Sequence, residues 1–325
     1  MGPAVPKEQS CARWLARAEE DTQLDIRPSR RGVLAGVAAA ALTVLLPTGG
    51  TAFAQSADDD GIAGQLRVLE REHSARLGVF AHDTGTGRTV LYRADELFPM
   101  CSTFKTIAVA AVLRDLNHDG KFLAKVIHYT KDYVTRAGYA PITGLPNNVA
   151  GGMTVADLCA AAIDYSDNGA ANLLLRELGG PDAVTRFCRS LGDRVTRLDR
   201  WEPDLNSAEP GRVTDTSSPR ALGLTYARLA LGDALKTPDR RRLTGWLLAN
   251  TTSANRFRVG LPKEWTLADK TGTGDHGTTN DVGITWPPGR KPIVLTVLST
   301  KHDSAAPADE PLVADTAALL AAALA

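Results

Sequence analysis

The sequence contains few residues of the kinds that mark a metalloenzyme, a disulfide framework or a nucleic-acid-binding protein. Four cysteines and six histidines are spread over 325 residues, and no group of them has the spacing of a zinc site. Lysine plus arginine and aspartate plus glutamate number 37 each, so the formal net charge is +0. Proteins that bind nucleic acids or anionic membranes through charge carry a clear basic excess. We therefore expect no metal, no cofactor and no nucleic-acid partner.

The sequence also lacks an apolar run of the roughly 20 residues that a membrane-spanning helix needs. The nearest is the stretch from Gly32 to about Leu46, which is rich in alanine and glycine. It follows the pair Arg30-Arg31 and precedes Ala52-Phe53-Ala54, whose small residues suit a signal peptidase. These features are typical of a twin-arginine export signal. An uncleaved membrane anchor is the alternative, which the short length and the cleavage site both oppose.

We predict that residues 1–54 form this signal and are removed, so that the mature protein starts near Gln55 without a stable membrane anchor. It would then be exported, either secreted or held in the periplasm or cell envelope. Cys11 leaves with the signal. An odd number of cysteines cannot pair completely, and cysteine often serves as a small core residue. We expect three buried free thiols: Cys101, Cys159 and Cys188.

Helical and strand-like patterns occupy separate parts of the remaining chain. The residues from Gly61 to Arg76 and from Leu312 to Leu324 have helical patterns, and so does the middle of the chain, from Pro99 to about Leu248. The stretch from Trp201 to Pro219 interrupts this middle region with three prolines, as a long functional loop would. Five runs are strand-like: 77–81, 88–92, 265–270, 281–286 and 293–299.

This order predicts an α+β protein with two lobes. One would be an α/β lobe built from both ends of the chain, residues 55–98 and 247–325. The other would be an all-helical lobe, residues 99–246, inserted between them. The interrupting loop would then belong to the helical lobe.

A nucleophile can be assigned to the run Ser102-Thr103-Phe104-Lys105, which opens a helical segment. A serine and a lysine at positions i and i+3 share one face of a helix. A serine hydroxyl attacks well only when a neighbour accepts its proton, and a lysine with a lowered pKa can do so. The helix N-terminus would also stabilise negative charge there. A helix-capping serine that happens to precede a lysine is the common structural alternative.

Two further motifs carry polar side chains in the same order along the chain. Ser166-Asp167-Asn168 supplies a second hydroxyl, a carboxylate and an amide between two apolar runs. Lys270-Thr271-Gly272 closes a strand-like run, where the lysine could hold a substrate carboxylate and the glycine would let a ligand approach the backbone. Each motif alone also suits a cap or a turn.

The joint order Ser-x-x-Lys, Ser-Asp-Asn, Lys-Thr-Gly is the signature of class A β-lactamases and penicillin-binding proteins. From about Gly61 to its end the sequence resembles a class A serine β-lactamase. The resemblance implies a five-stranded antiparallel sheet flanked by helices beside an all-helical lobe, with the active site between them. It also implies that β-lactam antibiotics are the substrates, that the enzyme confers resistance to them and that the protein is a monomer.

The stretch Arg200-Trp201-Glu202-Pro203-Asp204-Leu205-Asn206 resembles this family's omega-loop motif. In that motif the glutamate and the asparagine hold the hydrolytic water, and a general base is what an acyl-enzyme ester needs for hydrolysis. We take the omega loop as about residues 200–215, with Arg200 and Asp215 pairing at its neck. Pro203 would suit a cis peptide bond.

Further roles come from the resemblance alone. It implies that Tyr139 flanks the substrate entrance, that the N–H groups of Ser102 and Thr273 form the oxyanion hole, and that Arg256 supplies a second cation beside Lys270. The substrate-binding set is therefore Asn168, Asn206, Lys270, Thr271, Gly272, Thr273, Tyr139 and Arg256. The catalytic set is Ser102, Lys105, Ser166 and Glu202. Asp167 and Asp269 would be structural supports.

The sequence leaves some questions open. The first proton acceptor could be Lys105 or Glu202 acting through water, as is disputed for this family. A D-Ala-D-Ala carboxypeptidase that binds penicillin, or a β-lactam sensor, would share the first three motifs. Both should lack the glutamate–asparagine pair. Cys101 precedes the nucleophile, but no cysteine follows Lys270-Thr271-Gly272, so the disulfide of some carbapenem-hydrolysing members cannot form.

Overall fold

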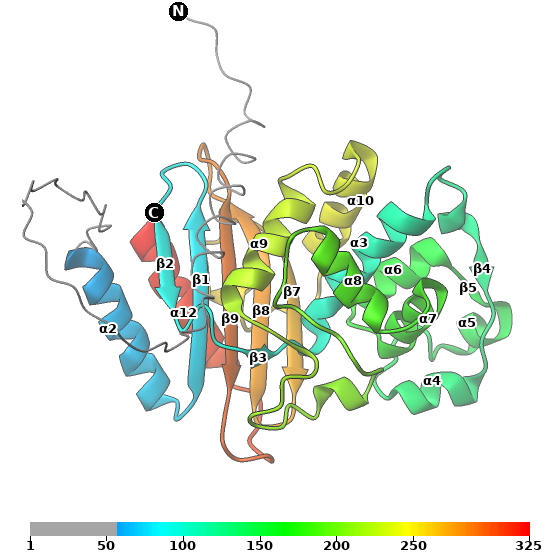
Figure 1. Cartoon of the computed structure of the whole chain (residues 1–325), viewed down its shortest axis with the longest axis horizontal. Coiled ribbons are helices and arrows are strands. Elements are labelled where there is room, and N and C mark those ends of the chain that lie inside the picture. The colour runs from blue at the N-terminus through cyan, green and yellow to red at the C-terminus, as the bar shows by residue number, and fades with distance from the viewer. Residues whose placement is uncertain (1–56) are drawn as a thin grey trace, which may run out of the picture.

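The computed structural model describes residues 57–325, so the predicted export signal lies outside the described residues. Its centre is a five-stranded antiparallel sheet in the order β2-β1-β9-β8-β7 (Figure 1). The first two strands come from the start of the described chain and the other three from its end. The strands are β1 (Arg76–Asp83), β2 (Thr89–Tyr92), β7 (Thr266–Gly274), β8 (Thr278–Trp286) and β9 (Ile293–Thr300).

The strand β7 is longer than its sequence pattern predicts. Its pairing with β8 continues from Thr266 opposite Trp286 to Gly274 opposite Thr278. The Lys270-Thr271-Gly272 motif therefore lies inside the strand, and the prediction that it closes the strand is wrong. Because β7 is at the edge of the sheet, the backbone groups on its outer side have no strand neighbour.

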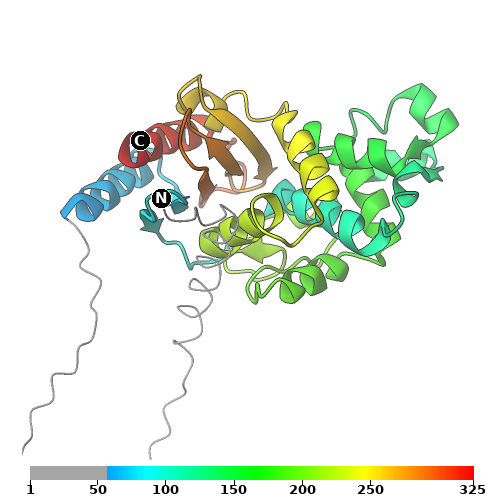
Figure 2. The same cartoon turned by 90° about the horizontal axis from the view of Figure 1, so that it is seen from above.

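One face of the sheet is covered by α2 (Ala57–Glu72), α11 (Phe257–Gly260) and α12 (Glu310–Leu324). Figure 2 shows α2 and α12 side by side on this face. Their apolar side chains meet those of the strands in a core that includes Leu66, Leu77, Phe257, Val297 and Leu320.

The first helix ends four residues before its predicted end. Its last residue is Glu72, Ser74 has a φ of 47°, and β1 begins at Arg76. A left-handed residue ends a helix, and the apolar run that follows is a buried strand.

The opposite face is covered by α9 (Pro219–Ala230). Leu224 and Ala227 pack there against Phe80 and two other strand residues. The close approach requires Gly223, because a Cβ at that position would lie 2.5 Å from the Phe80 ring. A helix from the range 99–246 therefore packs on the sheet, whereas the sequence placed that whole range in a separate helical lobe.

Most of the remaining helices pack around α3 (Phe104–Ala111), which is buried along its whole length and apolar on all sides except at Lys105 and Thr106. The α10 helix also packs against β7. In residues 57–325 no helix is long and apolar enough to span a membrane. The helices of this region besides α3 are α4 (Lys131–Ala137), α5 (Pro146–Gly151), α6 (Val155–Asp164), α7 (Asn168–Leu178), α8 (Asp182–Ser190) and α10 (Thr237–Leu248).

Short elements complete the fold. A 3-10 turn, Cys101–Thr103, leads into α3. Two small antiparallel pairs join distant segments, and one of them connects the residues before this turn to the end of the omega loop. The short strands are β3 (Phe98–Pro99), β4 (Val126–Ile127), β5 (Met153–Thr154) and β6 (Thr216–Ser217).

Candidate active site

The turn before α3 lies directly against the edge strand β7. A Cβ at Gly272 would lie 2.7 Å from the carbonyl oxygen of Met100. The absence of a side chain at Gly272 thus lets the backbone of the turn approach the strand. The sequence pattern instead predicts that a ligand occupies the space beside this glycine. Ser102 is thereby brought beside the Lys270-Thr271-Gly272 segment.

Lys105 connects three of the four predicted motifs. Its Nζ donates hydrogen bonds to the Ser166 carbonyl oxygen at 2.7 Å and to Asn168 Oδ1 at 2.6 Å. It also forms an ion pair with Glu202 Oε1 at 3.0 Å. Burial lowers the pKa of Lys105, and the Glu202 carboxylate opposes that shift. The Lys105 amine is therefore fully buried, with three oxygen partners within 3.0 Å.

Ser166 lies between two lysines. Lys270 Nζ donates to Ser166 Oγ at 3.0 Å, and Lys105 Nζ is 3.5 Å from the same oxygen. Ser166 has a φ of 57° and lies in the short connection between α6 and α7. Burial and the charge of Lys105 hold the pKa of Lys270 well below its usual range. The Ser166 hydroxyl therefore lies within reach of both amines.

Glu202 is held over the nucleophile by both its backbone and its side chain. The Asn172 amide bonds to the Glu202 N–H at 3.0 Å and to its carbonyl oxygen at 2.9 Å. Its carboxylate accepts from Ser102 Oγ at 3.5 Å and from Asn206 Nδ2 at 2.5 Å. The bond from Glu202 to Pro203 is cis, as predicted. The result is a carboxylate with fixed orientation, only 4% exposed, beside the Ser102 hydroxyl.

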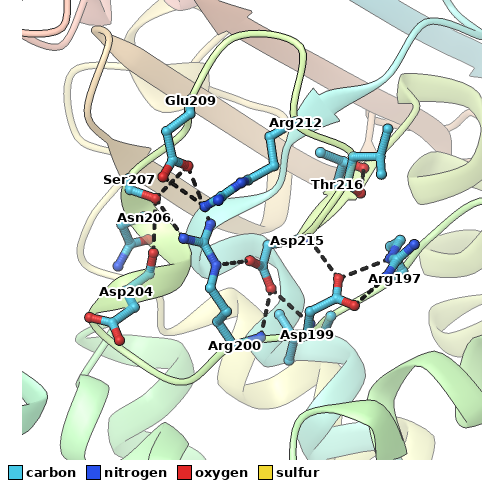
Figure 3. Close-up of polar contacts among 12 residues, drawn as sticks. Arg197, Asp199, Arg200, Asp204, Asn206, Ser207, Glu209, Arg212, Asp215 and Thr216 are labelled. Atoms are coloured by element: carbon cyan, nitrogen blue, oxygen red, sulfur yellow. Dashed lines mark hydrogen bonds and ion pairs between the residues drawn. The ribbon is translucent and has the colours of Figure 1, made fainter.

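The neck of the omega loop is closed by the predicted ion pair (Figure 3). Arg200 Nε donates to Asp215 Oδ2 at 2.5 Å, and Asp215 Oδ1 accepts from the backbone N–H of Asp199 at 2.8 Å. Arg200 also donates to Ser207 Oγ at 2.8 Å, which ties the neck to the residue after Asn206. The ion pair therefore supports the part of the loop that carries Asn206.

Asp167 and Asn168 hold the Ser166 segment in place. Asp167 caps α7, and both of its oxygens accept hydrogen bonds, including one from Thr143 Oγ1 at 2.7 Å. The Asn168 N–H donates to the Tyr139 carbonyl oxygen at 2.8 Å, while the Tyr139 residue is 60% exposed. Asp167 thus acts as the support that the sequence predicts.

Arg256 lies behind β7. Its guanidinium donates to the carbonyl oxygens of Gly272 and Asn280, both at 2.9 Å, and to Thr273 Oγ1 at 2.7 Å. Thr271 Oγ1 pairs with a second hydroxyl, that of Thr252, at 2.5 Å. Only 4% of Arg256 is exposed, so it acts on the cleft through Thr273 and the strand.

Sequence reasoning missed two residues that shape the site. Asn172 follows Asn168 by four positions, and that helical spacing was the available signal. Asn280 Nδ2 donates to the carbonyl oxygens of Pro99 and Met100 at 2.8 and 3.1 Å, which joins β8 to the turn before Ser102. No local pattern points to Asn280.

Two expectations concern groups outside the catalytic residues. The cysteines of the described chain, Cys101, Cys159 and Cys188, are all buried and free, as predicted. Within residues 57–325 no cluster of histidine, cysteine and carboxylate side chains has the geometry to hold a metal ion.

The fold and the site together define a class of protein. A lobe built on an antiparallel sheet and a helical region meet at a Ser-x-x-Lys pair, a Ser-Asp-Asn loop and a Lys-Thr-Gly edge strand. This combination is that of the serine enzymes that recognise penicillin.

Comparison with known proteins narrows the class. Residues 62–324 match the β-lactamase enzyme family. The chain is 66% identical over 298 residues to a β-lactamase of Streptomyces lavendulae, covering 92% of this chain and 98% of that protein. It is 47% identical over 251 residues to β-lactamase FAR-1 of Nocardia farcinica, covering 77% and 79%. A solved β-lactamase from Streptomyces albus G superposes with a TM-score of 0.81 at 66% identity, covering 82% of this chain and 100% of the other.

The chain belongs to the β-lactamase enzyme family. This confirms the resemblance to class A serine β-lactamases, the α+β fold class with its five-stranded antiparallel sheet, and the assignment as a hydrolase.

Proposed function

We propose that this β-lactamase hydrolyses the amide bond of penicillins and cephalosporins through an acyl-enzyme on Ser102, and thereby confers resistance to these antibiotics. The observation that carries the proposal is the buried Glu202 carboxylate, which lies 3.5 Å from the Ser102 hydroxyl and is bonded to Asn206. A group in that position is a base for the step that releases the acyl-enzyme.

In the first step Ser102 Oγ attacks the lactam carbonyl carbon, and the carbon–nitrogen bond of the ring breaks. Ser166, bonded to Lys270, donates its proton to the leaving nitrogen and is reprotonated by a neighbouring lysine. The N–H groups of Ser102 and Thr273 stabilise the transient oxyanion.

Two groups compete to accept the first proton. Glu202 Oε1 lies within reach of the Ser102 hydroxyl, directly or through one water. Lys105 is held as a donor to three acceptors, so it must first give a proton to Glu202, 3.0 Å away, before it can act as a base. In both routes Glu202 ends the first step protonated, and the lysine that reprotonates Ser166 ends it one proton short. The proton returns from Glu202 to Lys105 across their 3.0 Å contact. Glu202 is then a carboxylate again and takes a proton from the water that attacks the Ser102 ester.

The substrate carboxylate would bind along the edge strand. Lys270, Thr271 and Thr273 offer a cation and two hydroxyls along β7, and Arg256 adds a second positive charge behind Thr273. Asn168 and Tyr139 would contact the substrate from the helical side. We propose a monomeric enzyme, because the site that these groups form needs no residue from a second chain.

A chromogenic cephalosporin tests the proposal. We expect continuous turnover, with many product molecules formed per protein molecule, and no loss of rate in EDTA because no step needs a metal. A single stoichiometric burst would instead indicate a penicillin-binding peptidase or a sensor, and recovery by zinc after loss in EDTA would contradict the serine mechanism.

We also propose that residues 1–54 direct twin-arginine export, which would place the enzyme outside the cytoplasmic membrane, where β-lactams act. Replacing Arg30 and Arg31 with lysine should block export, because the signal depends on the arginine pair. The measurement is the β-lactamase activity outside the membrane relative to the total. Replacement of Arg27 with lysine is the matched control and should export normally. Normal export of the double variant would exclude the twin-arginine route.

A further inference from the structure

Two fully buried carboxyl groups lie behind the edge strand, on the face of the sheet opposite the Lys270 amine. Asp269 on β7 is opposite Gly283, and Asp281 on β8 is opposite Thr271. The two aspartates are therefore diagonal neighbours on one face of adjacent strands. Both are 0% exposed, so each carboxyl group has the other as a buried neighbour on the same face of the sheet. The mechanism above uses neither of them.

Each aspartate anchors one end of the segment 250–257. Asn250 Nδ2 donates to Asp269 Oδ2 at 2.9 Å, and the Phe257 N–H donates to Asp281 Oδ2 at 3.2 Å. This segment carries Arg256, which supports Gly272 and Thr273 from behind. The pair thus connects the core of the sheet to the second cation of the cleft.

The second oxygen of each aspartate has no donor. Among residues 57–325, neither Asp269 Oδ1 nor Asp281 Oδ1 has a hydrogen-bond partner, and neither does the nearby Ser253 Oγ. Arg258 Nη2 is 3.7 Å from Asp269 Oδ1, beyond hydrogen-bonding distance. A serine hydroxyl has one proton to donate, so it cannot satisfy two carboxylate oxygens.

The surrounding charges do not compensate two carboxylates. Arg256 faces the pair from the segment 250–257 and Arg258 faces it from α11, but Arg258 is half exposed and Arg256 already pairs with Glu310 at 3.3 Å. Lys270 points to the other face, where it bonds to Ser166. The further titratable neighbours are Lys105 beyond Lys270 and the buried Tyr226 of α9.

Two ionised carboxylates in contact inside a protein repel each other and are poorly solvated. Burial raises the pKa of both aspartates, and the charge of Asp269 raises that of Asp281 further. A single proton between the two Oδ1 atoms satisfies both oxygens and leaves one negative charge.

We propose that Asp269 and Asp281 share one proton at neutral pH, and that this carboxyl–carboxylate pair is a positioning element that holds Arg256 beneath the substrate-binding strand. When the proton is lost at alkaline pH, the two charges separate, the segment 250–257 loosens, and Arg256 no longer supports Thr273. Substrate binding therefore weakens, while Ser102 and Glu202 keep their places. This consequence rests on the proposed function of Thr273, but the shared proton does not.

Infrared difference spectroscopy tests the proton without any turnover. At about pH 8 the wild-type protein should show the C=O stretch of one buried protonated carboxyl group. Asp269→Asn and Asp281→Asn should each lack it, because an amide N–H replaces the shared proton and cannot ionise. Burial raises the pKa of Asp164 to about 6, so Asp164→Asn is the control and should keep the band at this pH. A wild type without the band, or a band that survives in both aspartate variants, would overturn the proposal.

Kinetics test the positioning role. At pH 7 each single asparagine variant should have a KM within about threefold of wild type, since it keeps one negative charge and the hydrogen bond. Between about pH 8 and pH 10 the KM of the wild type should rise by about tenfold more than the KM of either variant, which corresponds to a tenfold loss of affinity. The kcat values of the three proteins should differ little. Parallel KM profiles in all three proteins would show that the pair does not position Arg256.

Discussion

Replacing Ser102 with alanine is expected to abolish turnover of a chromogenic cephalosporin while the protein stays folded. The other catalytic hydroxyl, Ser166 Oγ, is bonded to Lys270 at 3.0 Å, whereas Ser102 Oγ is the one that bonds to Glu202. Loss of the nucleophile in a comparable serine enzyme costs on the order of 10⁶ in rate. The measurement is the steady-state rate together with the thermal unfolding midpoint.

A matched serine provides the control for this variant. Ser190 is exposed at the end of α8 and bonds only to the Phe187 carbonyl oxygen. Ser190→Ala should leave the rate unchanged. If Ser102→Ala kept more than a few per cent of the wild-type rate and folded normally, Ser102 would not be the nucleophile.

Replacing Glu202 with glutamine is expected to stop the cycle after acylation. The glutamine side chain can still accept a hydrogen bond from Lys105, which limits the cost of leaving a buried ammonium group without its partner. It cannot take a proton from water. A positioned general base contributes about 10²–10⁴ in rate, so a good penicillin should remain attached to Ser102 for minutes or longer. Intact-protein mass spectrometry would detect the adduct.

Two further variants make the result specific. Glu209→Gln changes another omega-loop carboxylate, one that is partly buried, bonds to Ser207 and Arg212, pairs with Arg200 and does not reach Ser102, and it should give no lasting adduct. The double variant Ser102→Ala with Glu202→Gln should give no adduct at all. If Glu202→Gln turned over at the wild-type rate with no adduct, the proposed deacylation step would be wrong.

The catalytic residues that could be predicted from the sequence are those that lie in short motifs of specific chemistry. Ser102 and Lys105 are three residues apart on one helical turn, and Glu202 and Asn206 are four residues apart in one loop, so their local spacing already implies a shared purpose. The strands were recognisable from alternation and apolar content, and the family resemblance supplied their assembly into one sheet. It also supplied the pairing of Arg200 with Asp215, which the structure contains.

Only the tertiary structure decided the contacts that join distant segments. Lys105 meets Ser166 and Glu202 across 61 and 97 positions because helix packing brings three separate loops to one end of α3. The α9 helix covers the sheet because Gly223 lets it approach Phe80. The extension of β7 past Lys270 was set by pairing with β8 rather than by its own residues.

The same limit applies to the buried carboxyl pair. Asp269 and Asp281 are unremarkable charged residues in two separate strands, and their sequence gives no sign that they face each other. Strand register makes them diagonal neighbours, and burial then makes it unfavourable for both to be ionised at once. The order of residues is enough to identify reactive groups that are close in the sequence. Strand register, burial and the resulting charge states depend instead on which distant segments pack together and exclude water.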